Sequence, residues 1–417
     1  MSGDWRTWLM IGAVGFGGPA GQVAILHREL VERRRWLDEE EFLSALRLCM
    51  LLPGPEAQQL ATYAGWRRDG LAGGLLAGTL FVLPGAVLVT ALAWLHAAGG
   101  SWPLVRAAFA GTRPAVVALV ALAAWRIGRK SVTSPGAVAI LAAAAAALAA
   151  GVAFPWVVVA AAICGGLLPS PPAKPAADPA AGSPPPADTA TGRPLGHIAL
   201  VVGLSVVVWA AALWAVVATH AAGGRGAAIA RLFTTTTLLS IGGAYAVVPW
   251  ALDESVARGW LEADERFTAL AMGEATPGPL ILVVTFIGFM AGWKALPDAA
   301  LQAGLSGASI ATLFAFLPSF AMIFGLAPFV RSIQAGSWVG RAMTGVGAAV
   351  VAAILLLAAR LAGDAFLAAG TLDPLAIAVA AAAAAALVAG RASTPIVVLA
   401  AAVIGVVTSL IGGSGLW

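Results

Sequence analysis

Long apolar stretches alternate with short polar ones along the chain, and the apolar stretches contain almost no charge. The main ones are Leu71–Leu95, Ala107–Trp125, Ala137–Leu168, Ile198–Val217, Leu375–Ala389 and Ile396–Ile411. A helix needs roughly 20 mostly apolar residues to cross a bilayer, and in lipid its backbone polar groups find partners only within the helix. The alternation of apolar and polar residues that is typical of strands is absent. The pattern therefore predicts an all-α polytopic membrane protein.

The composition agrees with this prediction and excludes several other classes. Hydrophobic residues make up 60% of the 417 positions and charged residues 11%, whereas soluble domains carry about 25% charged residues. The N-terminal MSGDWRTWLM lacks the features of a cleaved signal. Cys49 and Cys164 stand alone in apolar stretches, so we expect buried, unreactive thiols. Four His without HxxxH or CxxC spacing predict no metal site, no cofactor and no enzyme, and a net charge of +4 spread over loops predicts no nucleic-acid partner.

One segment differs from the rest in composition. Residues 170–193 read SPPAKPAADPAAGSPPPADTATGR, which is rich in Pro, Ala and Gly and has nothing to bury. Such a segment is typical of a flexible linker. The chain is therefore predicted to consist of an N-terminal repeat at 1–169, a linker at 170–195, an unpaired transmembrane helix at 196–220 and a C-terminal repeat at 221–417.

The two halves share an ordered series of motifs. In both, a Trp-Leu pair is followed by Pro-Gly-Pro seventeen residues after the Trp, at Trp36 and Pro53 and at Trp260 and Pro277. Upstream, FGGP at 16–19 matches IGGA at 241–244. Downstream, a gap-free register pairs Gly70-Leu71 with Gly304-Leu305, Gly73 with Gly307, Leu83-Pro84 with Leu317-Pro318, and residues 115–118 with 349–352. This order indicates an internal duplication.

Each repeat is predicted to hold six helical elements. Those of the first half cover about 5–26, 38–66, 70–97, 102–126, 135–150 and 152–168, and those of the second about 228–251, 264–293, 299–327, 338–361, 373–389 and 394–412. The unpaired span at about 196–219 lies between them. An even number of crossings plus one extra span inverts the second repeat relative to the first, as in many secondary transporters.

Positive charge indicates the orientation. Cytoplasmic loops are enriched in Lys and Arg, which places Arg33–Arg35, Arg67-Arg68 and the Arg126/Arg129/Lys130 cluster inside. If elements one and two of each repeat are re-entrant, all three basic clusters lie on the cytoplasmic side. If both elements cross the membrane instead, the first two clusters lie on opposite sides. Gly-rich and Pro-Gly-Pro interruptions favour the re-entrant arrangement, although the sequence leaves both open. The N-terminus would be cytoplasmic, and the C-terminus periplasmic or extracellular.

The duplicated Pro-Gly-Pro motifs are the first candidates for a binding site. The chain reads LPGPEA at 52–57 and ATPGPL at 275–280. Two prolines around a glycine stop one helix and start another, and Pro55 and Pro279 suit a first helical position. The new helix starts leave free N–H groups at 56–58 and 280–282, at the positive end of the helix dipole. Two such breaks meeting near the midplane would form an anion site, whereas the alternative is a structural kink in a packed helix.

Glycines and arginines extend this hypothesis. The Gly-rich breaks at Gly15–Gly21 and Ser240–Gly243 offer bare N–H groups, although glycine in membrane helices more often serves helix contact. Arg47 lies two turns before the first Pro-Gly-Pro, and Arg113 sits in an otherwise apolar run. A charge at membrane depth is usually functional, and the fork of Arg suits tetrahedral oxyanions.

Carboxylates flank both Pro-Gly-Pro motifs. Glu56 would lie in a helix first turn, where a carboxylate is also a favourable cap. Glu274 lies three residues before Pro277, at a helix C-terminal end where no cap explains it. A buried carboxyl there could carry a proton and couple it to anion binding. Asp253 and Glu254 are alternatives, although their surroundings resemble a solvated loop.

Together these residues resemble the chromate transporter family in its long two-domain form. The resemblance rests on FGGPAGQ, ERRRWLDEEEF, CMLLPGPEAQQLA, LPG at 83–85 and RPAVVAL in the first half, and on IGGAYAVVP, GWLEADERF, EATPGPL and TFIGF in the second. It implies proton-driven export of chromate across the bacterial inner membrane, giving chromate resistance. Two positions depart from the family pattern. Gln22 stands where the family often has a titratable His, and Glu56 where a small or amide residue is common.

The resulting hypothesis is a secondary active exporter of chromate or a similar oxyanion, coupled to proton influx. The alternatives are a transporter of sulfate or another oxyanion, a passive anion channel, and a membrane enzyme, for which no nucleophile–base set or metal-ligand set is present. The expected partners are the oxyanion, protons and the lipid bilayer, and a homodimer stays open. The candidate substrate-binding residues are Gly17, Gly18, Gln22, Arg47, Pro53, Gly54, Pro55, Gln59, Arg113, Gly242, Gly243, Tyr245, Pro277, Gly278 and Pro279, and the candidate proton-coupling residues are Glu56, Glu274 and Glu254.

Overall fold

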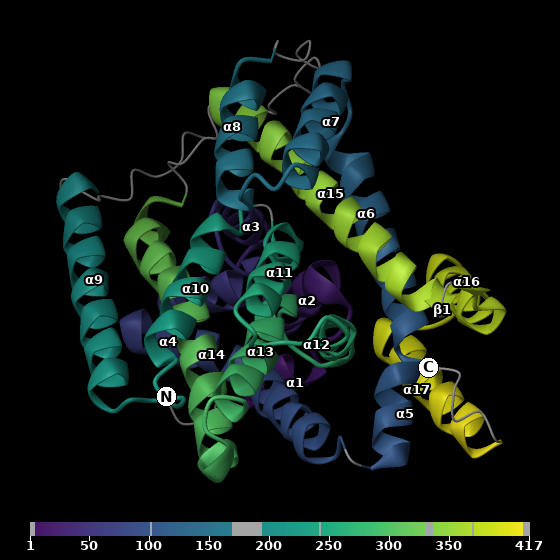
Figure 1. Cartoon of the computed structure of the whole chain (residues 1–417). Helices are drawn as coiled ribbons and strands as arrows, with labels where there is room; N and C mark the ends of the chain where they lie inside the picture. Colours follow the sequence, from purple (N-terminus) through teal and green to yellow (C-terminus); the bar gives the residue numbers. More distant parts are fainter. Residues whose placement is uncertain are drawn as a thin grey trace.

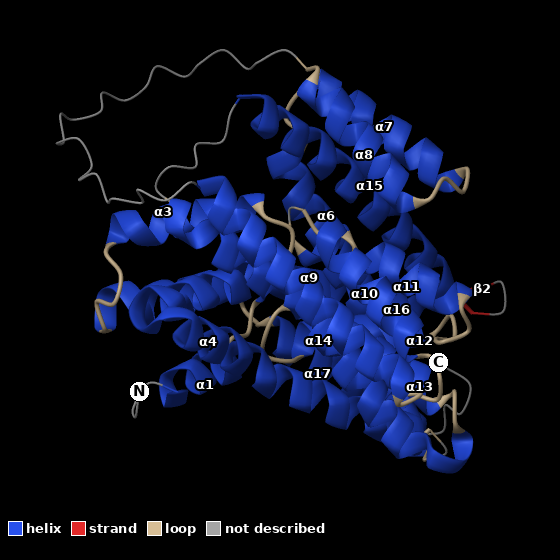
Figure 2. Cartoon of the chain, turned by 90° about the vertical axis from the view of Figure 1, so that its left-hand side faces the viewer, coloured by secondary structure: helices blue, strands red, loops and turns tan. Residues whose placement is uncertain are grey.

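The computed structural model describes residues 5–100, 102–168, 194–241, 243–330, 337–368 and 371–411. The predicted linker at 170–195 lies outside these residues except for its last two positions, which begin a helix. Gly242, a candidate site residue, also lies outside them. Helices make up nearly all of the described chain (Figure 2). The prediction of an all-α polytopic membrane protein is confirmed.

The helices follow the predicted elements closely. The first half contains α1 (Trp5–Val14), α2 (Gly18–His27), a π-helical turn (Arg28–Arg33), α3 (Glu39–Leu51), α4 (Glu56–Ala98), α5 (Pro103–Gly111), α6 (Arg113–Ser131), α7 (Pro135–Ala149) and α8 (Phe154–Gly166), and α9 (Pro194–Ala218) follows it. The second half contains α10 (Gly226–Leu239), α11 (Val248–Ala257), α12 (Glu265–Ala275), α13 (Val283–Trp293), α14 (Ala300–Leu326), α15 (Ser337–Phe366), α16 (Pro374–Val388) and α17 (Thr394–Leu410). Short 3₁₀ turns lie at Ala244–Ala246, Leu280–Leu282, Pro297–Ala299 and Ala327–Phe329, and strands β1 (Leu367–Ala368) and β2 (Thr371–Leu372) form one antiparallel hairpin.

Local sequence explains where many helices begin. The side chains of Asp38, Ser134 and Asp373 each accept a backbone N–H from the first turn of the helix that follows. Such caps satisfy donors that have no partner inside the helix. Proline stands in the first turn of several other helices, where its missing N–H costs nothing.

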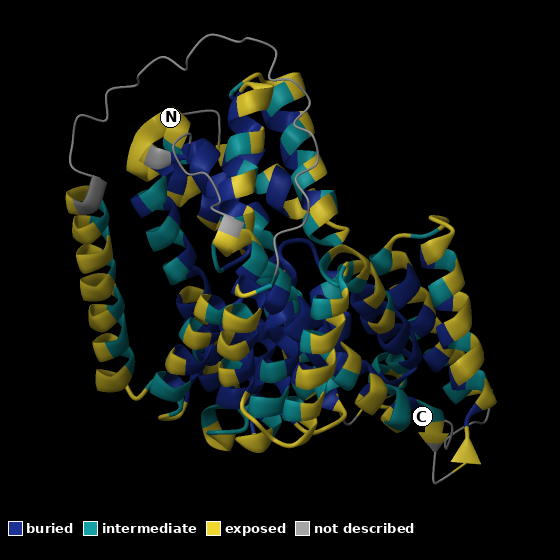
Figure 3. Cartoon of the chain, turned by 90° about the horizontal axis from the view of Figure 1, so that it is seen from above, coloured by how far each residue is buried: buried dark blue, intermediate teal, exposed yellow. Residues whose placement is uncertain are grey.

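Several helices can cross a membrane. Among the described residues, five segments are long and apolar enough: Glu56–Ala98, Pro103–Ser131, Gly196–Ala218, Pro297–Leu326 and Trp338–Phe366. Shorter apolar helices, α7, α8, α16 and α17 among them, accompany these spans. α9 stands at the edge of the molecule with its apolar side chains exposed (Figures 1 and 3), as expected for a helix that faces lipid.

The second element predicted for the first half, at 38–66, contains α3 and the beginning of α4. These two helices form an antiparallel hairpin. α4 reverses at Asp69 and Gly70, and Gly70 has a φ of +65° that suits glycine. Tyr63 Oη and Arg67 Nε donate to Glu41 Oε1 at 2.9 and 2.8 Å, so the start of α3 lies beside the end of the first part of α4. The chain therefore runs away from this end of the bundle and returns to it, as the re-entrant prediction requires.

A matching hairpin occurs in the second half. Glu265 stands five residues after Trp260, as Glu41 stands five residues after Trp36. Its carboxylate pairs with Lys294 Nζ at 2.6 Å, which joins the start of α12 to the end of α13. Both halves therefore contain a short helix, a Pro-Gly-Pro break and a returning helix, closed by an ion pair at the open end.

The two hairpins open toward opposite ends of the helix at 71–98. This second part of α4 begins close to Arg67. Near its other end, His96 Nε2 lies 3.5 Å from Glu265 Oε1. A helix of this length extends about 40 Å, enough to cross a bilayer. The arrangement is the one expected of inverted repeats.

The halves are also intertwined through reciprocal glycine contacts. α6 and α15 run side by side in opposite directions across the molecule (Figure 1). Gly345 of α15 packs backbone to backbone on Gly165 of α8, and Gly111 of α5 packs in the same way on Gly405 of α17. The fourth element of each half therefore contacts the last element of the other, which small residues permit.

We predict that the two hairpin openings face opposite sides of the membrane. Glu40 is exposed beside the first opening, and the Glu262 side chain is 74% exposed beside the second. In protein whose two cysteines are replaced, an impermeant maleimide added outside intact cells should label Glu262→Cys and leave Glu40→Cys unlabelled. Labelling of both from the same side would contradict the inversion.

A pH-dependent contact holds the charged segment between α2 and α3. His27 Nε2 lies 2.7 Å from Glu39 Oε2 and His27 Nδ1 lies 3.2 Å from Glu32 Oε1. The hydrogen bond to Glu39 raises the pKa of His27 above its ordinary value of 6.5.

The raised pKa sets the sign of a stability effect. The charged pair stabilises the fold fully below pH 6.5, and its contribution disappears as the pH rises through the higher pKa of the folded state. The His27→Gln variant should therefore melt below wild type in detergent at pH 5.5 and at the wild-type temperature well above neutrality. The exposed His220 makes no ion pair with any of the described residues, and His220→Asn should follow wild type throughout. A constant difference between His27→Gln and wild type at every pH would contradict the assignment.

Burial differs between the two cysteines. Cys49 is fully buried in α3, as expected. Cys164 is exposed on α8, so the prediction of burial is wrong for this residue. Its helix packs on α15 through Gly165, and the neighbouring side chain consequently points away from that contact.

Candidate functional site

The Gly-rich break of the first half meets the Pro-Gly-Pro of the second half. Gly17 and Gly18 have φ values of +92° and +68°, which turn the chain between α1 and α2. Gly278 N–H donates to Gly15 O at 3.0 Å. The buried Gln22 side chain donates from Nε2 to Gly15 O at 3.2 Å and to Gly278 O at 2.5 Å. Gln22 therefore does not face an open site but joins the two breaks.

The reciprocal contact brings the other two breaks together. Gly243, with a φ of +105°, lies beside Glu56, which follows the first Pro-Gly-Pro; a β-carbon on Gly243 would lie 3.6 Å from Glu56 Oε1. All four interruptions thus pair across the halves, the Gly-rich break of one with the Pro-Gly-Pro of the other. The direct meeting of the two Pro-Gly-Pro motifs with each other remains a prediction.

The Pro-Gly-Pro motifs also contact the proline turns of the opposite long helices. A β-carbon on Gly85, beside Pro84 of α4, would collide with Pro277 O, and a β-carbon on Gly54 would collide with Ser319 Oγ, beside Pro318 of α14. Gly54 and Gly278 have φ values of +120° and +97°, which L-residues rarely adopt. Only glycine fits these positions.

The helix starts differ from the prediction by one residue. Pro55 and Pro279 each immediately precede the first helical residue instead of occupying it, because both hold extended ψ angles of 106° and 140°. The N–H groups at 56–58 make no hydrogen bond among the described residues, as expected. In the second break Leu282 N–H donates to Pro279 O, so that donor is used.

Two carboxyl groups lie at these breaks, one from each half. Glu274, at the end of α12, accepts a short hydrogen bond from Tyr245 Oη. Glu56 and Glu274 are both half-buried, and Glu56 makes no hydrogen bond or ion pair within the described residues. Each half therefore places one carboxyl group at its Pro-Gly-Pro break.

Two cations of α6 complete the surroundings, and the sequence did not single them out for this role. Lys130 interacts electrostatically with Glu56, and Arg126 with Glu274 and Tyr245. Both side chains are exposed. In the sequence these two residues indicate only the orientation of the chain in the membrane. The order of residues alone does not show that the end of α6 returns to the two breaks.

Three candidates lie elsewhere. The exposed Arg47 donates to Ser44 Oγ on its own helix at 2.8 Å. Arg113 pairs with Asp264 at 3.0 Å, at the opposite end of α12 from Pro277. That helix has 11 residues, so Arg113 is about 15 Å from the break. Glu254 pairs with Arg258 at 2.7 Å.

Arg113 belongs instead to a polar cavity at the opening of the second hairpin. The cavity has a volume of about 470 Å³ and combines basic and acidic groups, among them His96, Arg106, Arg113, Glu262, Asp264, Glu265 and Lys294. It is lined by both halves, which makes it a vestibule at one end of the bundle.

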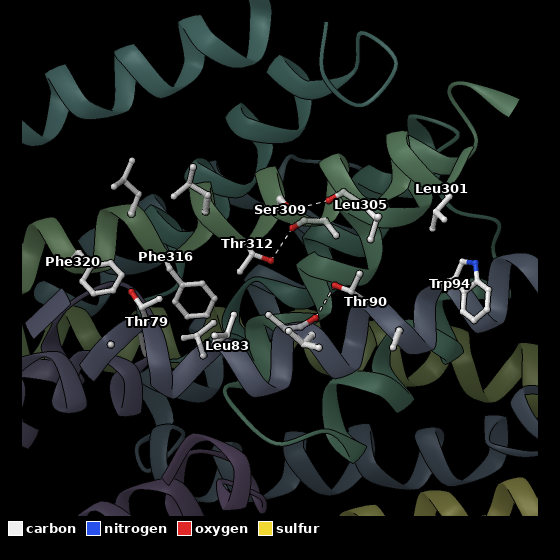
Figure 4. A pocket seen from close by; sticks show the side chains of 18 residues that line it. Thr79, Leu83, Thr90, Trp94, Leu301, Leu305, Ser309, Thr312, Phe316 and Phe320 are labelled. Atoms are coloured by element: carbon white, nitrogen blue, oxygen red, sulfur yellow. Dashed lines mark hydrogen bonds between the residues drawn. The ribbon is translucent and has the colours of Figure 1, made fainter. Parts of the chain in front are cut away.

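A larger groove of about 730 Å³ runs between α4 and α14 (Figure 4). Its lining is mostly apolar, and the hydroxyls of Thr90, Ser309 and Thr312 donate to carbonyls of their own helices. These three hydroxyls are therefore used, whereas Thr79, which also lines the groove, makes no hydrogen bond among the described residues. Between the breaks, by contrast, backbone N–H groups, carboxyls and cations occur together, and no cluster of metal-ligating residues was found among the described residues.

Comparisons with known proteins give one consistent result. A family model described as "Chromate transporter" matches residues 5–167 and 227–406. The chain is 31% identical to a "Chromate transport protein" of Pseudomonas aeruginosa, over 84% of this chain and 78% of that protein. It is 29% identical to a "Probable chromate transport protein" of Synechococcus elongatus, over 84% and 81%. No solved structure matches the chain.

Proposed function

The chain belongs to the chromate transporter family, and we propose that it is a secondary active transporter that exports chromate or a similar tetrahedral oxyanion across the bacterial inner membrane, coupled to proton influx. The names of the similar proteins from Pseudomonas aeruginosa and Synechococcus elongatus support chromate as the substrate.

The convergence of the four breaks carries the proposal. Each Gly-rich break packs on the Pro-Gly-Pro of the opposite half, through Gly15 with Gly278 and through Gly243 with the Glu56 side chain. Broken helices whose free N–H groups lie inside a membrane bundle are the usual anion sites of inverted-repeat transporters. Alternate rocking of the two halves would expose such a site first to one side and then to the other.

The two carboxyl groups supply the coupling. A proton on Glu274 removes the negative charge that Arg126 and Tyr245 now face, and a proton on Glu56 removes a negative charge beside the helix start of α4. An anion at that helix start therefore binds more tightly when Glu56 is neutral. Proton binding and oxyanion binding are linked in this way. Exchange requires in addition that the state carrying both proton and anion does not cross the membrane, so that the two ions cross in separate steps.

The orientation and the boundaries belong to the same proposal. We place the N-terminus in the cytoplasm and the C-terminus in the periplasm, with repeats at 1–169 and 221–417, the linker at 170–195 and the connecting span at 196–220. The contact of Arg68 with the Trp36 ring, at 3.9 Å, supports a common location for the two N-terminal basic clusters.

Reconstitution tests the function. Proteoliposomes containing the purified chain should take up chromate when an inwardly acidic pH gradient is imposed, and unlabelled sulfate in excess measures how far the site distinguishes the two anions. Flux that ignores the gradient would indicate a channel and contradict the proposal. Uptake of sulfate but not of chromate would show that sulfate is the substrate, and the proposed coupling mechanism would stand.

A further inference from the structure

The two Pro-Gly-Pro breaks are equivalent in sequence but differ in what surrounds them. We infer that the oxyanion binds at the first break only, and that Ser319 from the opposite half donates a hydrogen bond to it. This inference rests on the proposed function, since it names the site at which the exported anion is held.

The second break is already sealed by the protein. Gly278 N–H donates to Gly15 O, and Gln22 Nε2 donates to Gly278 O. The side chains that follow on the helix are the apolar Leu282, Val283 and Phe286. No donor from this set is left for an anion, and of the first-turn N–H groups only those of Leu280 and Ile281 have no partner among the described residues.

The first break has the opposite character. Counted from the Pro-Gly-Pro, the residues at the equivalent positions are Gln58, Gln59 and Thr62, and all three are fully buried. The N–H of Gly54, the counterpart of the capped Gly278 N–H, makes no hydrogen bond among the described residues. This break therefore combines free backbone donors with buried polar side chains.

Ser319 supplies the donor from the other half. Its side chain is 0% exposed and its Oγ has no hydrogen-bond partner among the described residues. A β-carbon placed on Gly54 would collide with Ser319 Oγ and lie 2.6 Å from Gln59 Nε2, so both groups lie directly over the break. In the gap-free register Ser319 corresponds to Gly85, so the second break has no hydroxyl at this place.

The hydroxyl is free because its usual acceptor is occupied. A helical serine normally bonds the carbonyl four residues earlier. For Ser319 that carbonyl belongs to Ala315, and Thr237 Oγ1 already donates to it at 2.6 Å. On the same helix Ser309 makes the normal bond to Leu305 O at 2.8 Å. A buried hydroxyl without a partner is unfavourable, and a ligand that accepts from it removes that cost.

The chemistry of this set fits a tetrahedral oxyanion. The N–H groups of Gly54 and of the first turn of α4 lie at the positive end of a helix dipole. Gln59 Nε2 gives one hydrogen to Pro53 O at 2.7 Å and keeps a second. Its unpartnered Oε1 can hold a water molecule that enters with the anion. Glu56 stands at the same helix start, where its protonation state modulates the binding.

Titration calorimetry on the purified full-length protein tests the inference, with chromate as the probe. Ser319→Ala should raise the Kd for chromate about tenfold or more, the effect of losing one hydrogen bond to a charged group. Ser309→Ala is the matched control on the same helix and should bind as wild type does. Without chromate, Ser319→Ala should unfold at the same temperature as Ser309→Ala or above it, because it removes a buried hydroxyl that has no partner.

The outcomes separate the inference from the function on which it rests. Wild-type affinity in Ser319→Ala would overturn the inference alone. Weakened binding in Gln22→Leu together with normal binding in Ser319→Ala would move the site to the second break and also overturn it. If wild-type protein neither binds nor transports chromate, the proposed function itself fails, whatever the variants do.

Discussion

Gly345→Leu should leave almost no correctly folded protein. A β-carbon at this position would lie 2.9 Å from Gly165 Cα and even closer to Ala161 O, so α8 and α15 cannot stay in contact. Overpacking a core usually costs about 1–3 kcal/mol, and here rigid backbone must move, which makes the cost larger. We expect aggregated material in size-exclusion chromatography after extraction in mild detergent.

A matched variant on the same helix controls for helix propensity and hydrophobicity. Gly363 has open space around its missing side chain, so Gly363→Leu should yield normal, monodisperse protein. The reciprocal pair predicts that Gly405→Leu fails as Gly345→Leu does, because its β-carbon would collide with Ala107 O. Normal yields for both Gly345→Leu and Gly405→Leu would show that the two halves are not intertwined as described.

Glu274→Gln should abolish proton coupling while preserving the fold. Glutamine keeps the volume of the side chain and an oxygen that accepts from Tyr245, but it cannot take up a proton. With the membrane potential clamped at zero, each coupled proton lets a one-unit pH gradient concentrate the anion about tenfold. The variant should only equilibrate chromate across proteoliposomes, and its thermal stability should stay near that of wild type.

A second carboxyl variant shows whether the loss is specific. The exposed Glu262 lies at the vestibule, 3.6 Å from Lys294, and Glu262→Gln should retain gradient-driven accumulation. Accumulation at the wild-type level in Glu274→Gln would remove this residue from the coupling mechanism. Glu56 would then be the remaining carboxyl at the breaks.

Much of the fold could be predicted from the sequence because its signals are local. Pro-Gly-Pro and Gly-Gly interrupt helices wherever they occur, so the breaks near Gly17, Gly54 and Gly278 are found where they are expected. The seventeen-residue spacing and the gap-free register reveal the duplication. The charge distribution and the helix breaks favour re-entrant hairpins over spanning helices, and the Glu41–Arg67 and Glu265–Lys294 pairs agree with that preference.

The site could be predicted only in part, because it depends on which residues meet in space. Arg113 is unusual in its apolar run, but its partner Asp264 lies 151 positions away. The sequence therefore does not show that the two residues form a pair. Ser319 is an ordinary serine in an apolar helix until Thr237 is seen to occupy its usual acceptor. Arg126 and Lys130 resemble a topological signal, and only the path of α6 brings them to Glu274 and Glu56.

The most direct test of coupled export measures both ions at once. Proteoliposomes containing the wild-type chain and a trapped pH indicator, clamped at zero potential, receive chromate outside at equal pH on both sides. The account predicts that the interior becomes more alkaline as chromate enters, since protons leave in exchange, and that Glu274→Gln shows no such change. Chromate entry in the wild type with no change of internal pH would contradict the account.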